Sequence, residues 1–186
     1  LSLLVKLIHF TNMKKPDEIV CVPLKDNTKR FLIGKRGQYE MLAIALNPST
    51  ANEDKLDPTY KNIELIANNN GCDGWWLVNL YPERISNPNK LTHKGNIKLT
   101  KKNIEFIKRI LISPKYNFLK IICCWGNFIT KRSFLSESAN QLLIYLKSQG
   151  YASECLGYTQ QGNPYHPSPL TINRLLGGIN NINLVK

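Results

Sequence analysis

Apolar runs and segments of helical periodicity alternate along the chain. Three apolar runs, each with a single polar residue, have the length of buried strands, and turn residues follow them: 39–46, 75–80 and 118–125. Three other segments place apolar residues three or four positions apart, as one face of a helix does: 58–69, 97–112 and 129–149. Strands that alternate with helices in this way predict an α/β fold with a parallel sheet.

The ends of these segments carry residues that begin and end helices. Asp57 and Pro58 form a typical helix start, because the Asp side chain accepts from free backbone N–H groups and Pro has no N–H to leave unpaired. Gly150 is placed to end the last helix. Shorter strand candidates are residues 19–24, 30–33 and 153–157. We therefore expect a central, mainly parallel four-stranded sheet in a single α/β domain at 39–186, preceded by a short β extension at 1–38.

Length and composition exclude several classes of protein. The 186 residues suit one domain, and no apolar run reaches the roughly 18 residues that a membrane span needs. The apolar start at 1–10 is not followed by a signal-peptide cleavage site. Five cysteines without a C-x-x-C pair indicate neither a disulfide framework nor a metal cluster. We therefore expect a cytoplasmic protein with no membrane contact, metal or cofactor, and a monomer.

The charge of the chain is strongly positive. Twenty-five Lys and Arg stand against thirteen Asp and Glu, a formal net charge of +12. The excess gathers between residues 85 and 133, where Glu105 is the only acidic residue. A concentrated field of this sign attracts polyanions, above all nucleic acid, through phosphate contacts that position a protein but read no sequence. The alternative is a basic, solvated surface without a polyanionic partner.

Polar loops follow the three apolar strands. They are Asn47-Pro48-Ser49, Asn79-Leu80-Tyr81 and Trp125-Gly126-Asn127. Because ligands of open α/β sheets bind outside the carboxyl ends of the strands, we expect these loops to converge on one binding site. The loop that contains His166 is a candidate to join them.

The tail segment His166-Pro167-Ser168-Pro169-Leu170 is the most specific motif in the chain. Its two prolines fix the backbone, so the side chains between them are held in defined directions. A His on such a loop can donate to a developing oxyanion, and an exposed Leu can wedge into a base stack. The alternative is a stiff surface loop with a hydrogen-bonded His.

These motifs resemble those of the uracil-DNA glycosylase superfamily, over roughly residues 40–172. The segment 166–170 is similar to its His-Pro-Ser-Pro-Leu loop, and 47–49 is similar to the Asn-Pro-Gly form of its water-activating motif. The chain also resembles a bacterial family described only as a domain of unknown function. The segments that carry this second resemblance are Leu46–Ala51, Asp57–Thr59, Val78–Leu80, Trp125-Gly126 and Leu156–Pro167.

The first resemblance implies a three-layer α/β sandwich and a set of residue roles. Asn47 would hold the attacking water, and His166 would stabilise the departing base. Asn79 would pair with the edge of a flipped pyrimidine. An aromatic residue would stack on that base, with Tyr81 ranked ahead of Tyr60 and Trp76. The residues expected to contact DNA are Ser49, Ser168, Leu170, Arg84, Lys131, Arg132 and Arg174.

The chain also departs from the superfamily pattern. Efficient uracil enzymes have Asp where Asn47 stands, and an amide can orient water but cannot take its proton. Asp57 is a spare carboxylate nearby, which either caps its helix or helps to position water. No four-cysteine cluster matches the iron–sulfur branches, and no lysine is placed as a covalent nucleophile.

We therefore expect a monofunctional DNA glycosylase. It would flip a base out of single- or double-stranded DNA, hydrolyse the N-glycosidic bond and leave an abasic site. The target would be uracil or a modified pyrimidine, including a hypermodified cytosine of phage DNA, which would make the protein a defence factor. Two alternatives remain: a catalytically silent DNA- or RNA-binding module of the same fold, and a nucleoside or nucleotide hydrolase.

Overall fold

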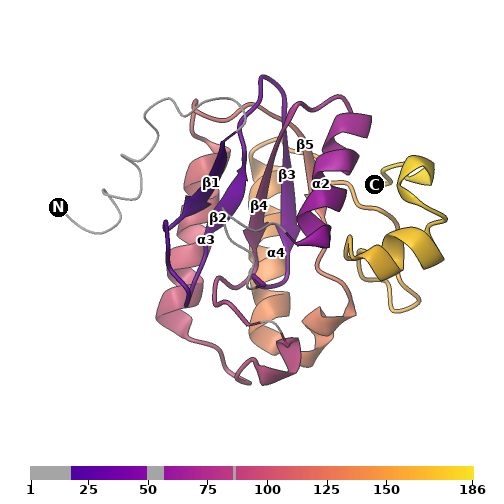
Figure 1. Cartoon of the computed structure of the whole chain (residues 1–186). Helices are drawn as coiled ribbons and strands as arrows, with labels where there is room; N and C mark the ends of the chain where they lie inside the picture. The colour runs from indigo at the N-terminus through magenta and orange to yellow at the C-terminus, as the bar shows by residue number, and fades with distance from the viewer. Residues whose placement is uncertain (1–17, 50–56, 86) are drawn as a thin grey trace.

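The computed structural model describes residues 18–49, 57–85 and 87–186. Thr50 and Ala51 of the family pattern, like the start of the predicted N-terminal extension, lie outside the described residues. The strands are β1 (Ile19–Val22), β2 (Leu32–Lys35), β3 (Glu40–Ala45), β4 (Gly74–Asn79) and β5 (Phe118–Cys123). The α-helices are α2 (Pro58–Asn69), α3 (Ile97–Leu111) and α4 (Ser133–Ser148) (Figure 1). Short helical turns are η1 (Pro88–Lys90), η2 (Asn127–Lys131), η3 (Thr171–Leu175) and η4 (Ile179–Asn181).

The sheet has five strands in the order β1-β2-β4-β3-β5. β3 pairs in parallel with both β4 and β5, whereas β2 is antiparallel to β4, and β1 to β2. The α/β class is thus confirmed, but the sheet is mixed instead of mainly parallel. The strands from the N-terminal extension continue the sheet beyond β4.

The fourth parallel strand expected at 153–157 is reduced to isolated bridges. Glu154 pairs with Ile122 of β5, and the next residue, Cys155, pairs with Val185 of the tail. Pairing ends there because the chain turns at Gly157, whose positive φ of 116° suits a residue without a Cβ.

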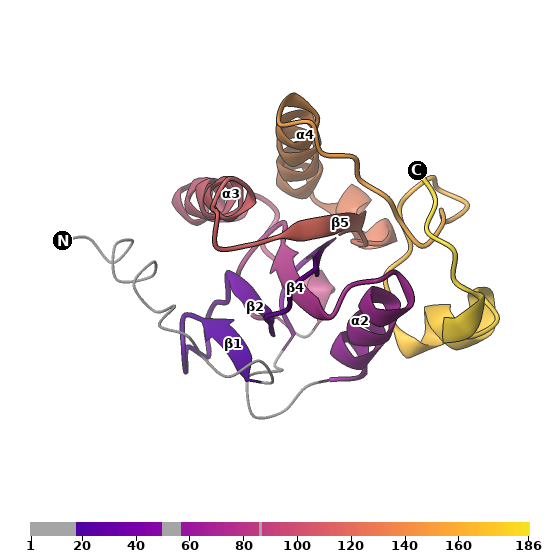
Figure 2. The same ribbon diagram turned by 90° about the horizontal axis from the view of Figure 1, so that it is seen from above.

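Helices cover both faces of the sheet. Successive strand residues point to opposite faces, so β3 sends Leu42 and Ile44 toward α3 and α4, and Met41 and Ala43 toward α2. Figure 2 shows α3 and α4 on one side of the sheet and α2 on the other, next to the C-terminal segment. Both cores are apolar, which explains why the strands read as continuous apolar runs.

The helices begin and end close to the residues predicted from the sequence, with one exception. Asp57 is the N-cap of α2, as predicted, and its side chain accepts from the backbone N–H groups of Thr59 and Tyr60. The predicted helix at 129–149 is instead the turn η2 followed by α4. Arg132 between them has an extended backbone, with φ −144° and ψ 112°, and so interrupts the helix.

The five cysteines are buried, with free thiols. Burial raises the pKa of Cys72 to about 11 and that of Cys123 to about 12, so these two thiols stay protonated at neutral pH. They serve as small core residues and not as nucleophiles. In the part of the chain that the structure describes, no helix has the length and apolar character to cross a membrane.

Candidate functional site

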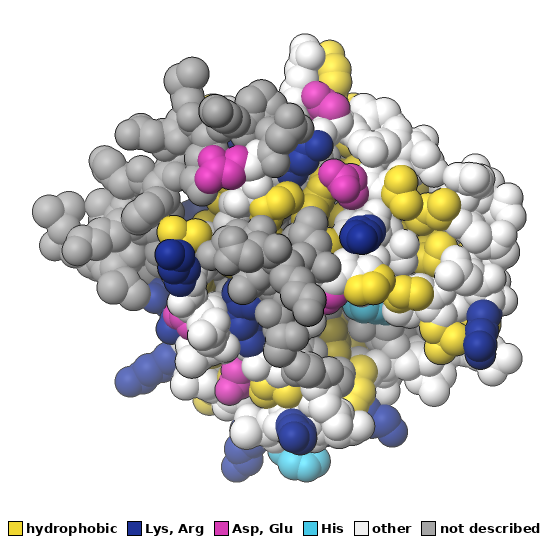
Figure 3. All heavy atoms as spheres, in the orientation of Figure 1, with side chains coloured by type: hydrophobic (Ala, Val, Ile, Leu, Met, Phe, Trp, Pro, Cys, Tyr) yellow, Lys and Arg dark blue, Asp and Glu magenta, His cyan; other side chains and the backbone are white. Residues whose placement is uncertain are grey.

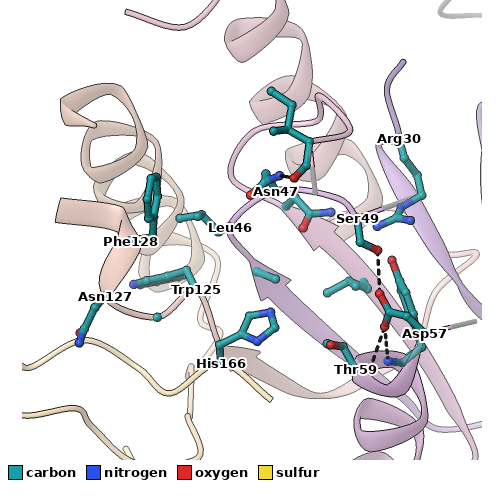
Figure 4. A pocket seen from close by; sticks show the side chains of 16 residues that line it. Arg30, Leu46, Asn47, Ser49, Asp57, Thr59, Trp125, Asn127, Phe128 and His166 are labelled. Atoms are coloured by element: carbon teal, nitrogen blue, oxygen red, sulfur yellow. Dashed lines mark hydrogen bonds between the residues drawn. The ribbon is translucent and has the colours of Figure 1, made fainter. Parts of the chain in front are cut away.

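A cavity of about 340 Å³ opens at the carboxyl ends of the three parallel strands. The chain runs from β3 to β4 on one side and then crosses to β5 on the other, so the strand order reverses at β3. Open α/β sheets bind ligands at such a reversal. Sixteen residues line the cavity: Arg30, Ala45, Leu46, Asn47, Ser49, Asp57, Thr59, Tyr60, Leu77, Asn79, Ile85, Trp125, Gly126, Asn127, Phe128 and His166 (Figure 4).

Asn47, directly after β3, is anchored through its amide nitrogen. This nitrogen donates to the carbonyl oxygen of Ile85 at 2.6 Å and to that of Pro48 at 3.2 Å. Both N–H groups are thus directed at backbone carbonyls, which also assigns the amide orientation. The chemistry that Asn47 offers to the cavity is therefore that of an acceptor, through Oδ1.

Asn79, the last residue of β4, is buried and lines the same cavity. Its backbone carbonyl accepts from the Asn103 side chain of α3 at 2.7 Å. Its own Nδ2 is buried and has no hydrogen-bond partner among the described residues. Unsatisfied buried donors are rare in folded proteins and call for an explanation. A ligand with an acceptor group in the cavity would satisfy this one.

The loop of His166 joins the cavity as expected. Two hydrogen bonds hold it there: the Gly126 backbone N–H donates to Pro164 at 2.9 Å, and the Asn62 side chain of α2 donates to Pro167 at 3.0 Å. Burial lowers the pKa of His166, and the charge of Asp57 opposes this shift. The imidazole is therefore neutral at pH 7 and can act as a hydrogen-bond donor.

Asp57 combines its cap role with a place in the cavity wall. One carboxylate oxygen accepts from the first turn of α2, and the other accepts from the Ser49 hydroxyl at 2.7 Å. We expected Ser49 to contact phosphate. Its hydroxyl donates to Asp57 inside the cavity wall, and the phosphate contact stays a prediction.

Arg30 and Tyr60 form the buried side of the wall. The guanidinium of Arg30 lies 5.2 Å from the centre of the Tyr60 ring, and both side chains are almost fully buried. Burial raises the pKa of Tyr60, so its phenol stays protonated. Figure 4 shows Arg30, Ser49 and Asp57 on one side of the cavity, and Leu46, Trp125 and Phe128 on the other.

Arg132 packs against Phe128, on the apolar side of the cavity. Its guanidinium lies 5.6 Å from the centre of the Phe128 ring and donates to the carbonyl oxygens of Leu91, Asn89 and Lys131. We expected Arg132 to contact DNA. These contacts tie η2 to the loop that precedes α3, and contact with DNA stays a prediction.

Tyr81 lies outside the cavity, contrary to its expected role in base stacking. Its ring packs edge-on against Phe134 of α4, and its hydroxyl accepts from the Asn96 backbone. Only 2% of the residue is exposed, so neither ring face is open to a base. Of the two tyrosines that we named, Tyr60 lines the cavity and Tyr81 does not.

The other residues expected to contact DNA do not line the cavity. Ser168 is hydrogen-bonded to Thr171 of η3, and Leu170 is exposed by 58%. Arg84 is half-buried, with a guanidinium nitrogen 3.6 Å from the Cys21 sulfur. Lys131 and Arg174 are exposed.

The central basic segment divides into two parts. Lys108 and Lys120 pair with Glu105 and Glu154. Among the exposed basic residues, Arg109 and Lys115 lie near the end of α3 or beyond it. A group of five exposed lysines precedes α3, lies in its first half or ends η2: Lys90, Lys94, Lys98, Lys101 and Lys131. Because Asn103 of α3 bonds to the end of β4, this group lies at the carboxyl edge of the sheet. Figure 3 shows Lys and Arg side chains along the lower edge of the molecule.

Sequence reasoning missed Arg30 and Phe128. Arg30 belongs to the N-terminal extension, which we had set apart from the functional domain. Phe128 follows Trp125-Gly126 directly, and this proximity was an available signal. Among the described residues, no three His, Cys, Asp or Glu side chains gather in a way that could hold a metal ion. The cavity can therefore orient a small polar ligand through amides, an imidazole and a guanidinium.

Comparison with known proteins gives a family but no characterised relative. No curated protein and no solved structure matches the chain. The pattern of one family, described as a protein of unknown function (DUF1643), matches residues 30–168. This match covers about three quarters of the chain and every residue that lines the cavity. The chain belongs to the DUF1643 family.

Proposed function

We propose that the chain is a monofunctional DNA N-glycosylase that acts on uracil or a modified pyrimidine. The observation that carries the proposal is the meeting of Asn47, Asn79 and His166 in one cavity. They come from three segments far apart in the sequence, and each corresponds to a motif similar to those of uracil-DNA glycosylases. A three-layer glycosylase-like fold is part of this proposal.

The dimensions of the cavity suit a single base. Small-molecule sites span about 300–1,000 Å³, and a volume of about 340 Å³ lies at the lower end. Apolar side chains face polar ones across it, which fits a planar base with a polar edge. With Tyr81 outside the cavity, Phe128 and Trp125 become our candidates for stacking on the base.

The proposed reaction breaks the bond between C1′ of the sugar and the base nitrogen. The electron pair of this bond goes to the base, and positive charge develops on the sugar. A water held by Asn47 Oδ1 forms the new bond to C1′ and gives up a proton, which the base anion finally takes up through solvent. Neutral His166 donates a hydrogen bond to the base as its negative charge develops.

DNA would bind across the carboxyl edge of the sheet. Exposed Lys131 lies three residues after Phe128 of the cavity, and exposed lysines precede α3 or lie in its first half. Exposed Leu170 and Arg174 lie directly before η3 and within it. Contacts of this kind provide salt-dependent affinity for phosphates. Exposed Leu170 can fill the space that an extruded base leaves in the stack.

One observation favours a second candidate, a silent nucleic-acid-binding module. The amide of Asn47 cannot accept a proton from water, so the site lacks a strong base at the position where efficient uracil enzymes have Asp. This candidate predicts salt-dependent DNA binding without abasic product.

A base-release assay tests the proposal. Oligonucleotides with uracil or modified pyrimidines are incubated with the wild type, Asn47→Ala and His166→Ala, then treated with alkali to cleave abasic sites. We expect strand breaks with the wild type and about a hundredfold fewer with His166→Ala. DNA binding without strand breaks on any substrate would support the silent module instead.

A further inference from the structure

Asn103 is a buried polar residue in the middle of α3. The buried residues next to it on this helix, among them Ile104, Ile107 and Leu111, are apolar members of the core. The side chain of Asn103 is 0% exposed, so bulk water cannot pair with its polar atoms. Buried polar groups in folded proteins are hydrogen-bonded, so the partners of Asn103 indicate its role.

The partners of Asn103 are two backbone carbonyl groups where β4 ends. Its Nδ2 donates to the carbonyl oxygen of Asn79 at 2.7 Å and to that of Leu80 at 3.2 Å. The register of β2 against β4 ends at Leu77, before either of these carbonyl groups. Asn103 therefore supplies donors to β4 where its antiparallel partner strand has ended.

The other half of the Asn103 amide has no partner. Its Oδ1 is buried and unpaired among the described residues. An unpaired buried acceptor destabilises a fold, so packing alone would favour an apolar residue at this position. The two contacts at the end of β4 therefore explain why an amide occupies it.

The turn after β4 is also held by β3 and by the start of α3. The Leu80 N–H donates to the Ala45 carbonyl oxygen at 2.9 Å, and the Tyr81 N–H donates to that of Leu46 at 3.1 Å. The Tyr81 hydroxyl accepts from the backbone N–H of Asn96 at 3.1 Å. Helix α3 thus contacts this turn at two points, one at its N-cap and one in its middle.

The direction of the Asn79 side chain depends on this turn. Its Nδ2 is buried and has no hydrogen-bond partner among the described residues, although Asn79 lines the cavity. Because no hydrogen bond fixes this Nδ2, its position follows from the rotamer that the backbone at the end of β4 allows. Asn103 fixes that backbone, since it holds the carbonyl group of Asn79 itself.

We propose that Asn103 is a positioning residue, which holds the end of β4 so that the Asn79 amide faces the base in the cavity. The inference rests on the proposed glycosylase function, in which Asn79 contacts the edge of the base. Asn103 does not line the cavity and acts only through Asn79. Helix α3 then has two tasks, because its first half also carries the exposed lysines Lys98 and Lys101.

The orientation of Asn79 can be measured without any reaction. In isotope-labelled protein, NMR couplings across the Cα–Cβ bond of Asn79 report the rotamer of its side chain. We expect a single rotamer in the wild type and averaged couplings in Asn103→Leu, which has a similar shape but no donor. Asn103→Ser, whose hydroxyl is too short to reach both carbonyl groups, is a second variant with the same expected result. Ile107→Val, another buried change on α3, is the matched control and should keep the wild-type couplings.

Base-release kinetics measure the consequence for the reaction. Asn103→Leu should lower kcat on uracil-containing DNA by about a hundredfold, because a displacement of about 1 Å can cost that factor. KM for DNA should stay nearly unchanged, since the exposed lysines are untouched. Asn103→Gln, which keeps the amide on a longer side chain, should recover part of the rate, and Ile107→Val should leave both constants unchanged.

A double variant separates positioning from a general structural role. In protein that already has Asn79→Ala, Asn103→Leu should cause no further loss of rate, because the residue through which Asn103 acts is gone. A role in stability alone predicts that the two losses add. Circular dichroism and thermal unfolding establish which variants are folded.

The outcomes separate this inference from the proposed function. A single Asn79 rotamer that depends on Asn103, without base release from any DNA, would keep Asn103 as the residue that positions Asn79 and reject the glycosylase. Averaged couplings in the wild type, or unchanged couplings in folded Asn103→Leu or Asn103→Ser, would overturn the role of Asn103. Base release with additive losses in the double variant would overturn it as well.

Discussion

Replacing Asn47 by Asp is expected to damage the protein, although efficient uracil-DNA glycosylases carry Asp in the similar motif. The Asn47 amide nitrogen donates to the carbonyl oxygens of Ile85 and Pro48, at 2.6 and 3.2 Å. A carboxylate has no N–H and would turn an oxygen toward these two acceptors. The substitution therefore removes the contacts that hold the side chain in place.

The cost follows from these two contacts. Each lost hydrogen bond contributes about 0.5–1.5 kcal/mol, so we expect the free energy of unfolding to fall by about 1–3 kcal/mol. The loop that carries Ile85 would also shift from the end of β3, and the acceptor oxygen would leave its position. Because a displacement of about 1 Å can lower a rate a hundredfold, base release should fall by about that factor.

Urea unfolding and base-release kinetics of Asn47→Asp test both effects. Asn140→Asp, the same change at an exposed position within α4, is the control and should alter stability by less than about 0.5 kcal/mol. An Asn47→Asp protein as stable as the wild type, with equal or faster base release, would refute the anchoring role of the amide.

Three further predictions concern His166, Asp57 and the basic edge. Burial lowers the pKa of His166 in the folded protein, whereas a His side chain in the unfolded chain has a pKa of about 6.5. As the pH falls, the unfolded chain therefore binds a proton at His166 before the folded protein does. The free energy of unfolding should therefore fall as the pH drops from 7 to 5, and urea titrations of His166→Gln should show a smaller fall. Asp57→Ala should lower the free energy of unfolding by about 1 kcal/mol through loss of the helix cap, and Asp57→Ser, which can cap α2, should recover most of it in thermal unfolding. Lys131→Ala should weaken DNA binding and reduce the slope of log affinity against log salt by about one, whereas Lys147→Ala should leave the slope unchanged in fluorescence titrations.

Local sequence signals predicted the elements and much of the cavity. β3, β4 and the second half of β5 are buried on both faces, as their apolar runs predicted, and Asp57 caps its helix. Both features depend on residues that are neighbours in the sequence. The polar residues Asn47 and Asn79 meet because parallel strands bring their carboxyl ends to one edge of the sheet. His166 joins them although no strand leads directly into its loop.

Features that depend on contacts between distant residues could not be predicted from the sequence. Tyr81 stands two residues after Asn79, and continued strand alternation would place both on one face. The strand ends at Asn79, however, and the chain turns, so Leu80 and Tyr81 both pack toward α3 and α4. Arg30 has the sequence appearance of a surface charge, and only its burial against Tyr60 reveals it as part of the cavity.

Detection of a free base by mass spectrometry tests the central claim most directly. Phage genomic DNAs with different modified pyrimidines and uracil-containing DNA are incubated with the wild type or with His166→Ala, and the small molecules are separated from the polymer. We predict that the wild type releases one base and leaves an equal number of abasic sites, and that His166→Ala releases far less. Intact DNA with no released base, from a folded protein that binds it, would contradict the account.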